Sequence, residues 1–594
     1  MAAQGGSTQS TAGYAAFESR DDLQAYGDNA LLLFVAQMRL GFDDVDTFAS
    51  NSLTDGNNDK KCDLVAVSAD KQRIVLAQGY MTSKVPLGAA PANKASDLNT
   101  GVSWLLDGDL DKLPETLRGA AEEVRDALHG GEIRELQLWY VHNCVESSNV
   151  GTELAQAIKT ANRVIKATFP DLDIDVSATE IGRSALEDEY ARMQAPILVS
   201  EEYTFKVPGG FELSAQDWSA FSTAVAVADL RALWADHKAS LMSPNLRDYL
   251  GVVRSSGNIN FGIKETAKGQ PDNFAIYNNG ITVLVNDYVH VVDDDGKHTL
   301  RVKGVGIVNG GQTTGALGSL DATEAGTAHG ARVMARFVKC TNESVLGDIV
   351  KYNNTQNKVE ATDFRSKDAV QDRLRKEFSR IPEADYRGGR RGGTTDAILR
   401  MKTLVPDSSV AQSLAAFHGE PNLAYNETRS IWDNDAVYSS VFRDTVTASH
   451  IVYAYGLLKA IEKTKKDMLA IPENSRTRAQ KQHAAYFSAR GSNYLLMAAL
   501  GSCIETVLGV AIADRYALSF KKNLSPADAT KAWQPVVELA TALSSMLSPA
   551  TDRGLKSQDR VRKAIEDFSA MLEVARSANP GPFDALADMT YTGV

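Results

Sequence analysis

The spacing of apolar residues changes along this 594-residue chain, and this change constrains its fold more than any other feature. Up to about residue 345, short runs rich in Val, Ile and Leu predict strands. After that point, apolar residues recur every three or four positions, which predicts helices. The apolar residues of the two patterns cannot be buried within one layer of secondary structure. The sequence therefore predicts a multi-domain α/β protein.

The two patterns divide the chain into expected domains. A flexible N-terminus is expected over residues 1–20 and a helix-flanked α/β domain over 21–185. A β-rich central domain is expected over 195–345 and an α-helical region over 346–594. The predicted strands cover residues 63–67, 73–80, 135–143, 173–179, 197–207, 274–294, 299–311 and 331–340.

Charge and cysteine content exclude several classes of protein. A net charge of −12 argues against a uniformly basic surface for nucleic acid, although it leaves room for a local basic groove. The 4 cysteines are far apart and form no CxxC pair, so no zinc or disulfide framework is indicated. The N-terminus lacks a secretion signal, and the apolar stretch at 493–513 is interrupted by Glu505, which favours a buried helix over a membrane span. We therefore expect a reduced, cytoplasmic protein without a membrane partner.

An acidic residue and an amide lie on two neighbouring predicted strands. Asp63 stands at the start of one strand and Gln78 near the end of the next. This arrangement resembles the PD-(D/E)xK nucleases, including their Mrr-like branch, in which glutamine is tolerated at the second position. The resemblance implies a restriction-endonuclease-like fold and a Mg²⁺ ion held by oxygen ligands, with a lysine that polarises the attacking water.

The lysine position departs from this pattern. The spacing requires a lysine at position 80, where the chain has Tyr80, and Lys84 is the only nearby substitute. Three interpretations remain open: an active site with a displaced lysine, a nuclease fold without activity, or a solvated turn between two core strands. The acidic residues Asp55, Asp59 and Asp63 keep metal binding plausible without the lysine.

Three clusters of Asn, Gln, Gly and Thr follow in the middle of the chain, and we call them the polar clusters. They are NFAIYNNGITVL (273–284), VNGGQTTGAL (308–317) and VKYNNTQNKVEATDF (350–364). Uncharged donors and acceptors of this kind suit a shared neutral pocket, or three turns that satisfy their own backbone. The candidate ligand-binding residues are Asn278, Asn279, Asn309, Gln312, Thr313, Asn353 and Asn354.

The order of these segments resembles the AIPR family, named for abortive infection phage resistance. The resemblance runs from about residue 241 to 430, from LMSPNLRDYLG to FHGEPNLAY. It implies a role in anti-phage defence and adds Arg247, which recurs in the family pattern, to the candidate ligand-binding residues; an ion pair with Asp248 is the alternative role.

GGQTTGAL is also faintly similar to DGQHR-type proteins and to the ParB/sulfiredoxin fold, in which a turn that opens a helix holds phosphate or DNA. Here Thr313 and Thr314 stand where a basic residue is expected, and no Walker A loop is present. Anion binding and a structural turn packed on Asn278 and Asn279 both remain open.

Two basic clusters interrupt the acidic average and are the candidates for contact with nucleic acid. One is the glycine-rich RGGRRGGTT (387–395), and the other is RTRAQKQHAAYFSAR (476–490), whose Tyr486 and Phe487 suggest stacking on bases. The alternative, which the acidic composition favours, is a mobile loop and a solvated helix face. The candidate residues are Arg387, Arg390, Arg391, Arg478 and Lys481.

Two functions follow from these observations. The first is an anti-phage defence protein whose N-terminal domain is a metal-dependent nuclease, with Asp63, Gln78 and Lys84 at its centre. The second is a non-catalytic sensor or scaffold that binds nucleic acid, a nucleotide, a phage component or a partner defence protein. Assembly into a homo-oligomer is left open.

Overall fold

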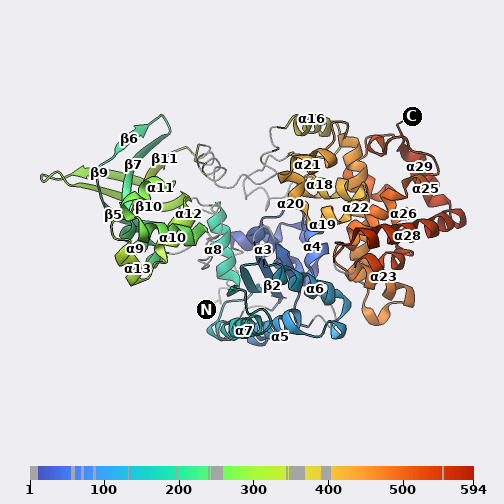
Figure 1. Ribbon diagram of the computed structural model, residues 1–594, viewed down its shortest axis with the longest axis horizontal. Helices are drawn as coiled ribbons and strands as arrows, with labels where there is room; N and C mark the ends of the chain where they lie inside the picture. The colour runs from blue at the N-terminus through green and yellow to red at the C-terminus, as the bar shows by residue number, and fades with distance from the viewer. Residues whose placement is uncertain are drawn as a thin grey trace, which may run out of the picture. The chain divides into compact units, whose positions relative to one another are not determined.

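The computed structural model describes residues 11–54, 60–68, 72–84, 88–131, 133–194, 197, 199–237, 241–242, 259–342, 345–346, 349, 353, 365, 368–388, 403–551 and 554–593 (Figure 1). The chain divides into two compact units. The central unit contains residues 185–359 with the short pieces 1–16 and 393–395. The composite unit joins residues 17–184 to 360–392 and 396–594.

The composite unit contains a four-stranded mixed sheet in the order β1-β2-β3-β4. Its strands are β1 (Leu64–Ser68), β2 (Arg73–Tyr80), β3 (Glu135–His142) and β4 (Asp175–Ile181). Strands β1 and β2 are antiparallel, whereas β2, β3 and β4 run parallel. Parallel neighbours need crossover connections, which here are helical.

Helices cover both faces of this sheet. The crossover helices α5 (Ala92–Asp107), α6 (Glu115–His129) and α7 (Ser148–Thr168) share one hydrophobic core with the sheet, and α5 and α7 lie side by side (Figure 1). Helix α3 (Ala30–Leu40) packs against β2 and β3, where Leu32 approaches Gly79. Burial on both faces explains the nearly continuous apolar strands. The remaining helices of this part are α2 (Asp21–Gln24) and α4 (Val45–Ser52), whereas most of α1 (Ala12–Glu18) and α8 (Arg183–Gln194) belongs to the central unit.

The rest of the composite unit is largely helical and is arranged around the buried helix α22 (Ala448–Leu469), which packs against α18, α24 and α26 (Figure 1). The described helices here also include α16 (Ala369–Phe378), α18 (Asp407–Phe417), α19 (Pro421–Asn426), α20 (Thr428–Asp433), α21 (Asp435–Val441), α23 (Arg478–Ser488), α24 (Ser492–Ser502), α25 (Ile504–Leu508), α26 (Pro526–Thr541), α27 (Ser548–Thr551), α28 (Gln558–Ala578) and α29 (Gly581–Met589). Strands β12 (Ser519–Phe520) and β13 (Thr590–Tyr591) form a small ribbon. Within the described part of the chain, no helix has the length and apolar character needed to cross a membrane.

The central unit is built on a seven-stranded sheet in the order β5-β10-β8-β11-β7-β6, with β9 paired to β10. Its strands are β5 (Val199–Val207), β6 (Phe211–Ser214), β7 (Trp218–Ala226), β8 (Ile281–Leu284), β9 (Asp287–Val292), β10 (His298–Asn309) and β11 (Arg332–Cys340). Its helices are α9 (Val227–His237), α10 (Ile259–Gly269), α11 (Phe274–Tyr277), α12 (Gly311–Gly318) and α13 (Ala322–Thr327). The sheet and helices α9, α12 and α13 contribute to one core.

The predicted fold class is confirmed: a mixed sheet with helices comes first, then a central sheet, then a largely helical region. The strand predicted to begin at residue 274 is wrong over Phe274–Tyr277, which form helix α11. Strands β6 and β7 and helices α9 and α10 carry too short or too mixed a pattern to have been predicted.

Candidate functional site

The first candidate site lies where β1 begins and β2 ends. Strand pairing sets Leu64 opposite Ala77, so the residues beside them, Asp63 and Gln78, come together. Gln78 Nε2 donates to Asp63 Oδ2 at 2.6 Å, and the Gly79 backbone N–H donates to the same oxygen at 2.7 Å. The two side chains that were predicted to lie close together are therefore in contact, and Asp63 and Gln78 are 8% and 4% exposed, respectively.

The lysine of the nuclease pattern has no counterpart in this arrangement. Tyr80 ends β2 and packs partly buried against the sheet core. Lys84 is exposed, four residues beyond the strand, and its backbone N–H donates to Thr82 Oγ1 at 3.2 Å. Within the described part of the chain, no hydrogen bond or ion pair joins the Lys84 side chain to Asp63 or Gln78. The geometry gives no support to Lys84 as a catalytic residue.

Gln78 still offers one unused oxygen. Its Oε1 is buried and has no hydrogen-bond partner in the described part of the chain. Amide and carboxylate oxygens are the ligands that Mg²⁺ takes in proteins, so Gln78 Oε1 and Asp63 fit two positions of such a site. Asp55 and Asp59, the other predicted metal ligands, lie outside the described residues. Among the residues that are described, no group of three acidic, histidine or cysteine side chains could hold a metal ion.

A second polar pair, not predicted as functional, lies at the same end of the sheet. His142 ends β3, and its Nε2 is 3.1 Å from Glu180 Oε1 on β4. Because the Cys144 backbone N–H donates to His142 Nδ1, the proton of the neutral ring is on Nε2 and points to Glu180. Burial lowers the pKa of His142 to about 4 and raises the pKa of Glu180 to about 6. The register between β3 and β4 was the signal that could have found Glu180.

Two glycines shape the polar turn of the central unit. Gly310 has φ +84° and precedes α12, and Gly280 has φ +78° and precedes β8. A Cβ at Gly310 would lie 2.6 Å from Gly280 O, and one at Gly280 would lie 2.4 Å from Met334 O. Glycine is required at both positions because the backbones approach too closely for a side chain.

Residues of the three polar clusters lie together around this turn. Asn278 Nδ2 donates to Thr313 Oγ1 at 3.1 Å, and Asn278 Oδ1 accepts from the Gly280 backbone N–H at 2.9 Å. Asn309 Nδ2 donates to Asn353 O at 3.1 Å. Many of these donors and acceptors are therefore hydrogen-bonded within the protein, as expected for a structural turn. Asn279 is exposed and Gln312 is half-buried, whereas Arg247 and Asn354 lie outside the described residues.

An arginine that sequence reasoning missed lies beside the turn. Arg336 on β11 is exposed, and its Nη2 donates to Thr282 Oγ1 at 3.0 Å and to Asn353 Oδ1 at 3.3 Å. Strand pairing places Arg336 opposite Thr282, and Thr282 opposite Asn309. In ARVMARFVKC, apolar and other residues alternate, which places Arg336 on the exposed face of the strand; this was the sequence signal that could have found it.

Comparison with protein families gives one match, which covers residues 242–509 and is described as AIPR protein. The chain contains an AIPR family domain. This is the family, named for abortive infection phage resistance, that the order of the central segments resembles. Comparisons with curated proteins and with solved structures find no match.

The AIPR domain includes the central turn and continues through the helical region to α25. The N-terminal sheet with Asp63 and Gln78 precedes the matched residues. Both Asn278 and Arg336 belong to the AIPR domain, as does the stretch FHGEPNLAY at 417–425.

The basic residues of the AIPR domain differ in accessibility. Arg478 and Lys481 are exposed one turn apart on α23, and Arg387 is half-buried. Arg390 and Arg391 lie outside the described residues. The predicted stacking of bases on two aromatic residues of this segment is wrong because both belong to the hydrophobic core. They are Tyr486 and Phe487, exposed by 1% and 0%.

Proposed function

We propose that this chain acts in anti-phage defence by recognition, with an N-terminal nuclease-like fold that does not cut. One observation carries the proposal: the Asp63 carboxylate is buried and accepts hydrogen bonds from Gln78 and Gly79, while the lysine position holds Tyr80. A carboxylate held in this way, with a tyrosine at the lysine position, is well placed to stabilise the sheet. It is poorly placed to activate water.

Nucleic acid is the ligand that we propose for this recognition. The support comes from Arg478 and Lys481, which project from the surface of α23 and can meet phosphate groups. Binding to a phage protein or to a partner defence protein is the alternative within the same function.

A metal-dependent nuclease is the second candidate, and the buried, unpartnered Gln78 Oε1 favours it. In that case Asp63 and Gln78 would hold Mg²⁺, which would supply an activated water for phosphodiester hydrolysis. Asp55 and Asp59 remain proposed ligands for the same ion.

A cleavage assay separates the two candidates. The full chain is incubated with plasmid, linear and single-stranded DNA and with RNA, in the presence of Mg²⁺ or Mn²⁺. Beside it stand Asp63→Asn, which has nearly the same shape and can still accept from the Gly79 N–H, and Asp175→Asn, which changes an exposed carboxylate at the start of β4. We expect no cleavage by any of the three proteins. Cleavage that is lost in Asp63→Asn and kept in Asp175→Asn would establish the nuclease and refute the proposal.

Binding and protection from phage test recognition directly. Fluorescence anisotropy with labelled DNA and RNA should show binding that weakens with salt, and the double variant Arg478→Gln/Lys481→Gln should bind about tenfold more weakly. Cells carrying Asp63→Asn should keep wild-type protection in a phage plating assay. Failure to bind either nucleic acid would exclude it as the ligand, and loss of protection in Asp63→Asn would point back to the nuclease.

A further inference from the structure

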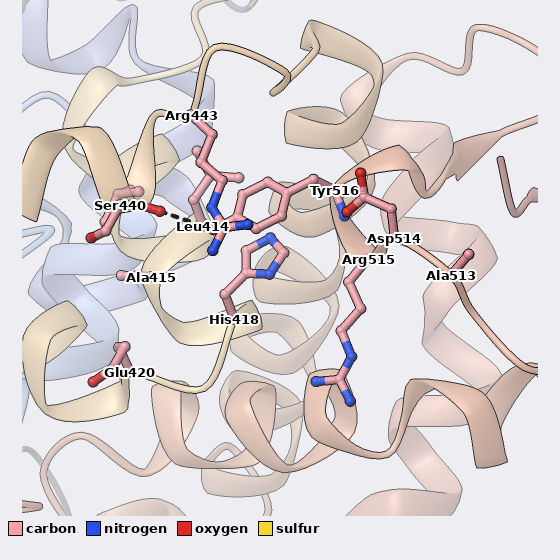
Figure 2. Close-up of a pocket in the computed structure, with 11 residues that line it drawn as sticks. Leu414, Ala415, His418, Glu420, Ser440, Arg443, Ala513, Asp514, Arg515 and Tyr516 are labelled. Atoms are coloured by element: carbon pink, nitrogen blue, oxygen red, sulfur yellow. Dashed lines mark hydrogen bonds between the residues drawn. The ribbon is translucent and has the colours of Figure 1, made fainter.

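A hollow of about 360 Å³ in the helical region is lined by histidine, arginine and tyrosine side chains that have no part in the proposed function. It is lined by residues from the end of α18, from the loop after α21 and from the segment before β12. His418 and Arg443 both lie against the ring of Tyr516 (Figure 2). The His418 ring is stacked on Tyr516 with centroids 3.6 Å apart, and Arg443 Cζ is 4.2 Å from the Tyr516 centroid.

A chain of hydrogen bonds determines which nitrogen of His418 carries its proton. His450 Nδ1 is 2.8 Å from Leu518 O, which can only accept, so His450 donates from Nδ1. Burial lowers the pKa of His450 to about 4, so its Nε2 carries a lone pair at neutral pH. His418 Nε2 lies 3.0 Å from that lone pair and must donate to it. The lone pair of His418 is therefore on Nδ1, which makes no hydrogen bond within the described part of the chain.

Two arginines, Arg443 and Arg515, and two carboxylates, Glu420 and Asp514, line the hollow. Burial, with smaller contributions from His450 and the two arginines, lowers the pKa of His418 to about 2. Of the carboxylates at the hollow, Asp514 accepts from the Tyr516 backbone N–H at 2.9 Å, and Glu420 is exposed. A guest that fits this lining pairs with the guanidinium groups of Arg443 and of Arg515, whose Nη2 also donates to Ser502 O at 3.3 Å, and brings a proton for His418 Nδ1.

We infer that this hollow binds a phosphate monoester of a hydroxylated small molecule. Guanidinium groups recognise phosphate oxygens, and a monoester retains an ionisable P–OH that a diester lacks. One proton can then be shared between the phosphate and His418 Nδ1. A second hollow of about 610 Å³ shares Asp514 and Tyr516 with the first and offers Thr447, Ser449 and Asn523 to hydroxyl groups of the same guest.

The shared proton makes the binding depend on pH. A phosphate monoester loses its second proton near pH 6, so binding at about pH 8 must take up close to one proton. Binding at about pH 5.5 needs little uptake because the ester already carries the proton. This inference stands apart from the proposed function, since it involves neither Asp63 nor a nucleic-acid strand.

Isothermal titration calorimetry of the full chain tests the assignment, with ribose 5-phosphate, AMP, inorganic phosphate and 3′,5′-cyclic AMP as probes. Buffers of different ionisation enthalpy report the proton uptake. We expect both monoesters to bind, with uptake of about one proton at about pH 8, and the cyclic diester to bind at least about tenfold more weakly. Binding of inorganic phosphate at the same affinity as the monoesters would show that only the phosphate group is recognised, and would refute the monoester assignment.

Variants identify the groups involved. Arg515→Gln and the exposed Arg443→Gln should each weaken binding of ribose 5-phosphate at least about tenfold. His418→Asn, which keeps an acceptor near Nδ1 but does not titrate, should abolish the proton uptake. Arg562→Gln, on the exposed face of α28, is the matched control and should bind as the wild type does. No binding of either monoester, wild-type affinity in both hollow-lining arginine variants, or binding without proton uptake would each overturn the inference.

Discussion

Single buried histidines determine how this protein should respond to acid. His450 is fully buried, and its folded-state pKa of about 4 lies below the value of about 6.5 expected in an unfolded chain. The unfolded state then binds the proton more tightly, so the stability is present above about pH 6.5 and is lost as the pH falls towards about 4. Burial explains the low pKa of His450, because the charged ring that forms when a second proton binds would be shielded from water.

We expect the unfolding free energy to fall by about 2 kcal/mol between about pH 7 and about pH 4.5 because the unfolded chain protonates His450 more readily than the folded chain does. His450→Asn, whose amide can still donate to Leu518 O, should lower the stability at pH 7 but lose about 2 kcal/mol less on acidification. Urea unfolding at both pH values measures the difference. The control is His129→Asn, an exposed histidine, which should keep the wild-type dependence. The same dependence in His450→Asn would contradict the argument.

At the scale of elements, the turn between β10 and α12 depends on two glycines that face each other. An alanine at Gly310 would have to adopt φ +84° and would place its Cβ 2.6 Å from Gly280 O. We expect Gly310→Ala to destabilise the central unit by about 2–4 kcal/mol, from backbone strain and overlap together. Gly262→Ala, in the interior of α10 with open space around it, should be neutral or stabilise by up to about 1 kcal/mol. Urea unfolding compares the two variants, and equal stabilities would show that the turn can relax.

The elements also show how far the sequence could predict this protein. Strands β1, β2, β3 and β4 were predicted within about two residues, and for the first three the reason is that apolar runs between charged turns indicate strands consistently. Helix α11 was taken for a strand because four residues carry no periodicity. The pairing of Asp63 with Gln78 followed from strand neighbours. The contacts of Arg336 and of His418 with His450 depend on which distant segments pack together, and local pattern does not encode that.

At the scale of the whole molecule, buried charges join the N-terminal part of the composite unit to its helices. Lys459 on α22 donates to Asp44 Oδ2 at 2.6 Å and to Glu462 Oε2 at 2.8 Å. Asp44 also caps α4 through the Thr47 N–H, and Thr47 Oγ1 donates to Glu462 Oε1 at 2.7 Å. Burial raises the pKa of Glu462 to about 7, and the Lys459 ammonium group opposes that rise. The Lys459 ammonium group thus links segments more than 400 residues apart.

Removing that ammonium group should weaken both segments at once. Lys459→Met leaves the buried Asp44 and Glu462 without their cation, and breaking such a cluster costs about 3–5 kcal/mol. Lys463→Met, one turn along the same helix, removes only an exposed pair with Asp467 and should change stability by less than about 0.5 kcal/mol. Hydrogen exchange read by mass spectrometry should rise together in peptides covering 45–52 and 448–469 of Lys459→Met, and in neither for the control. Since α4 and α22 share the cluster, faster exchange in only one of them would show that the N-terminal segment is held by other contacts.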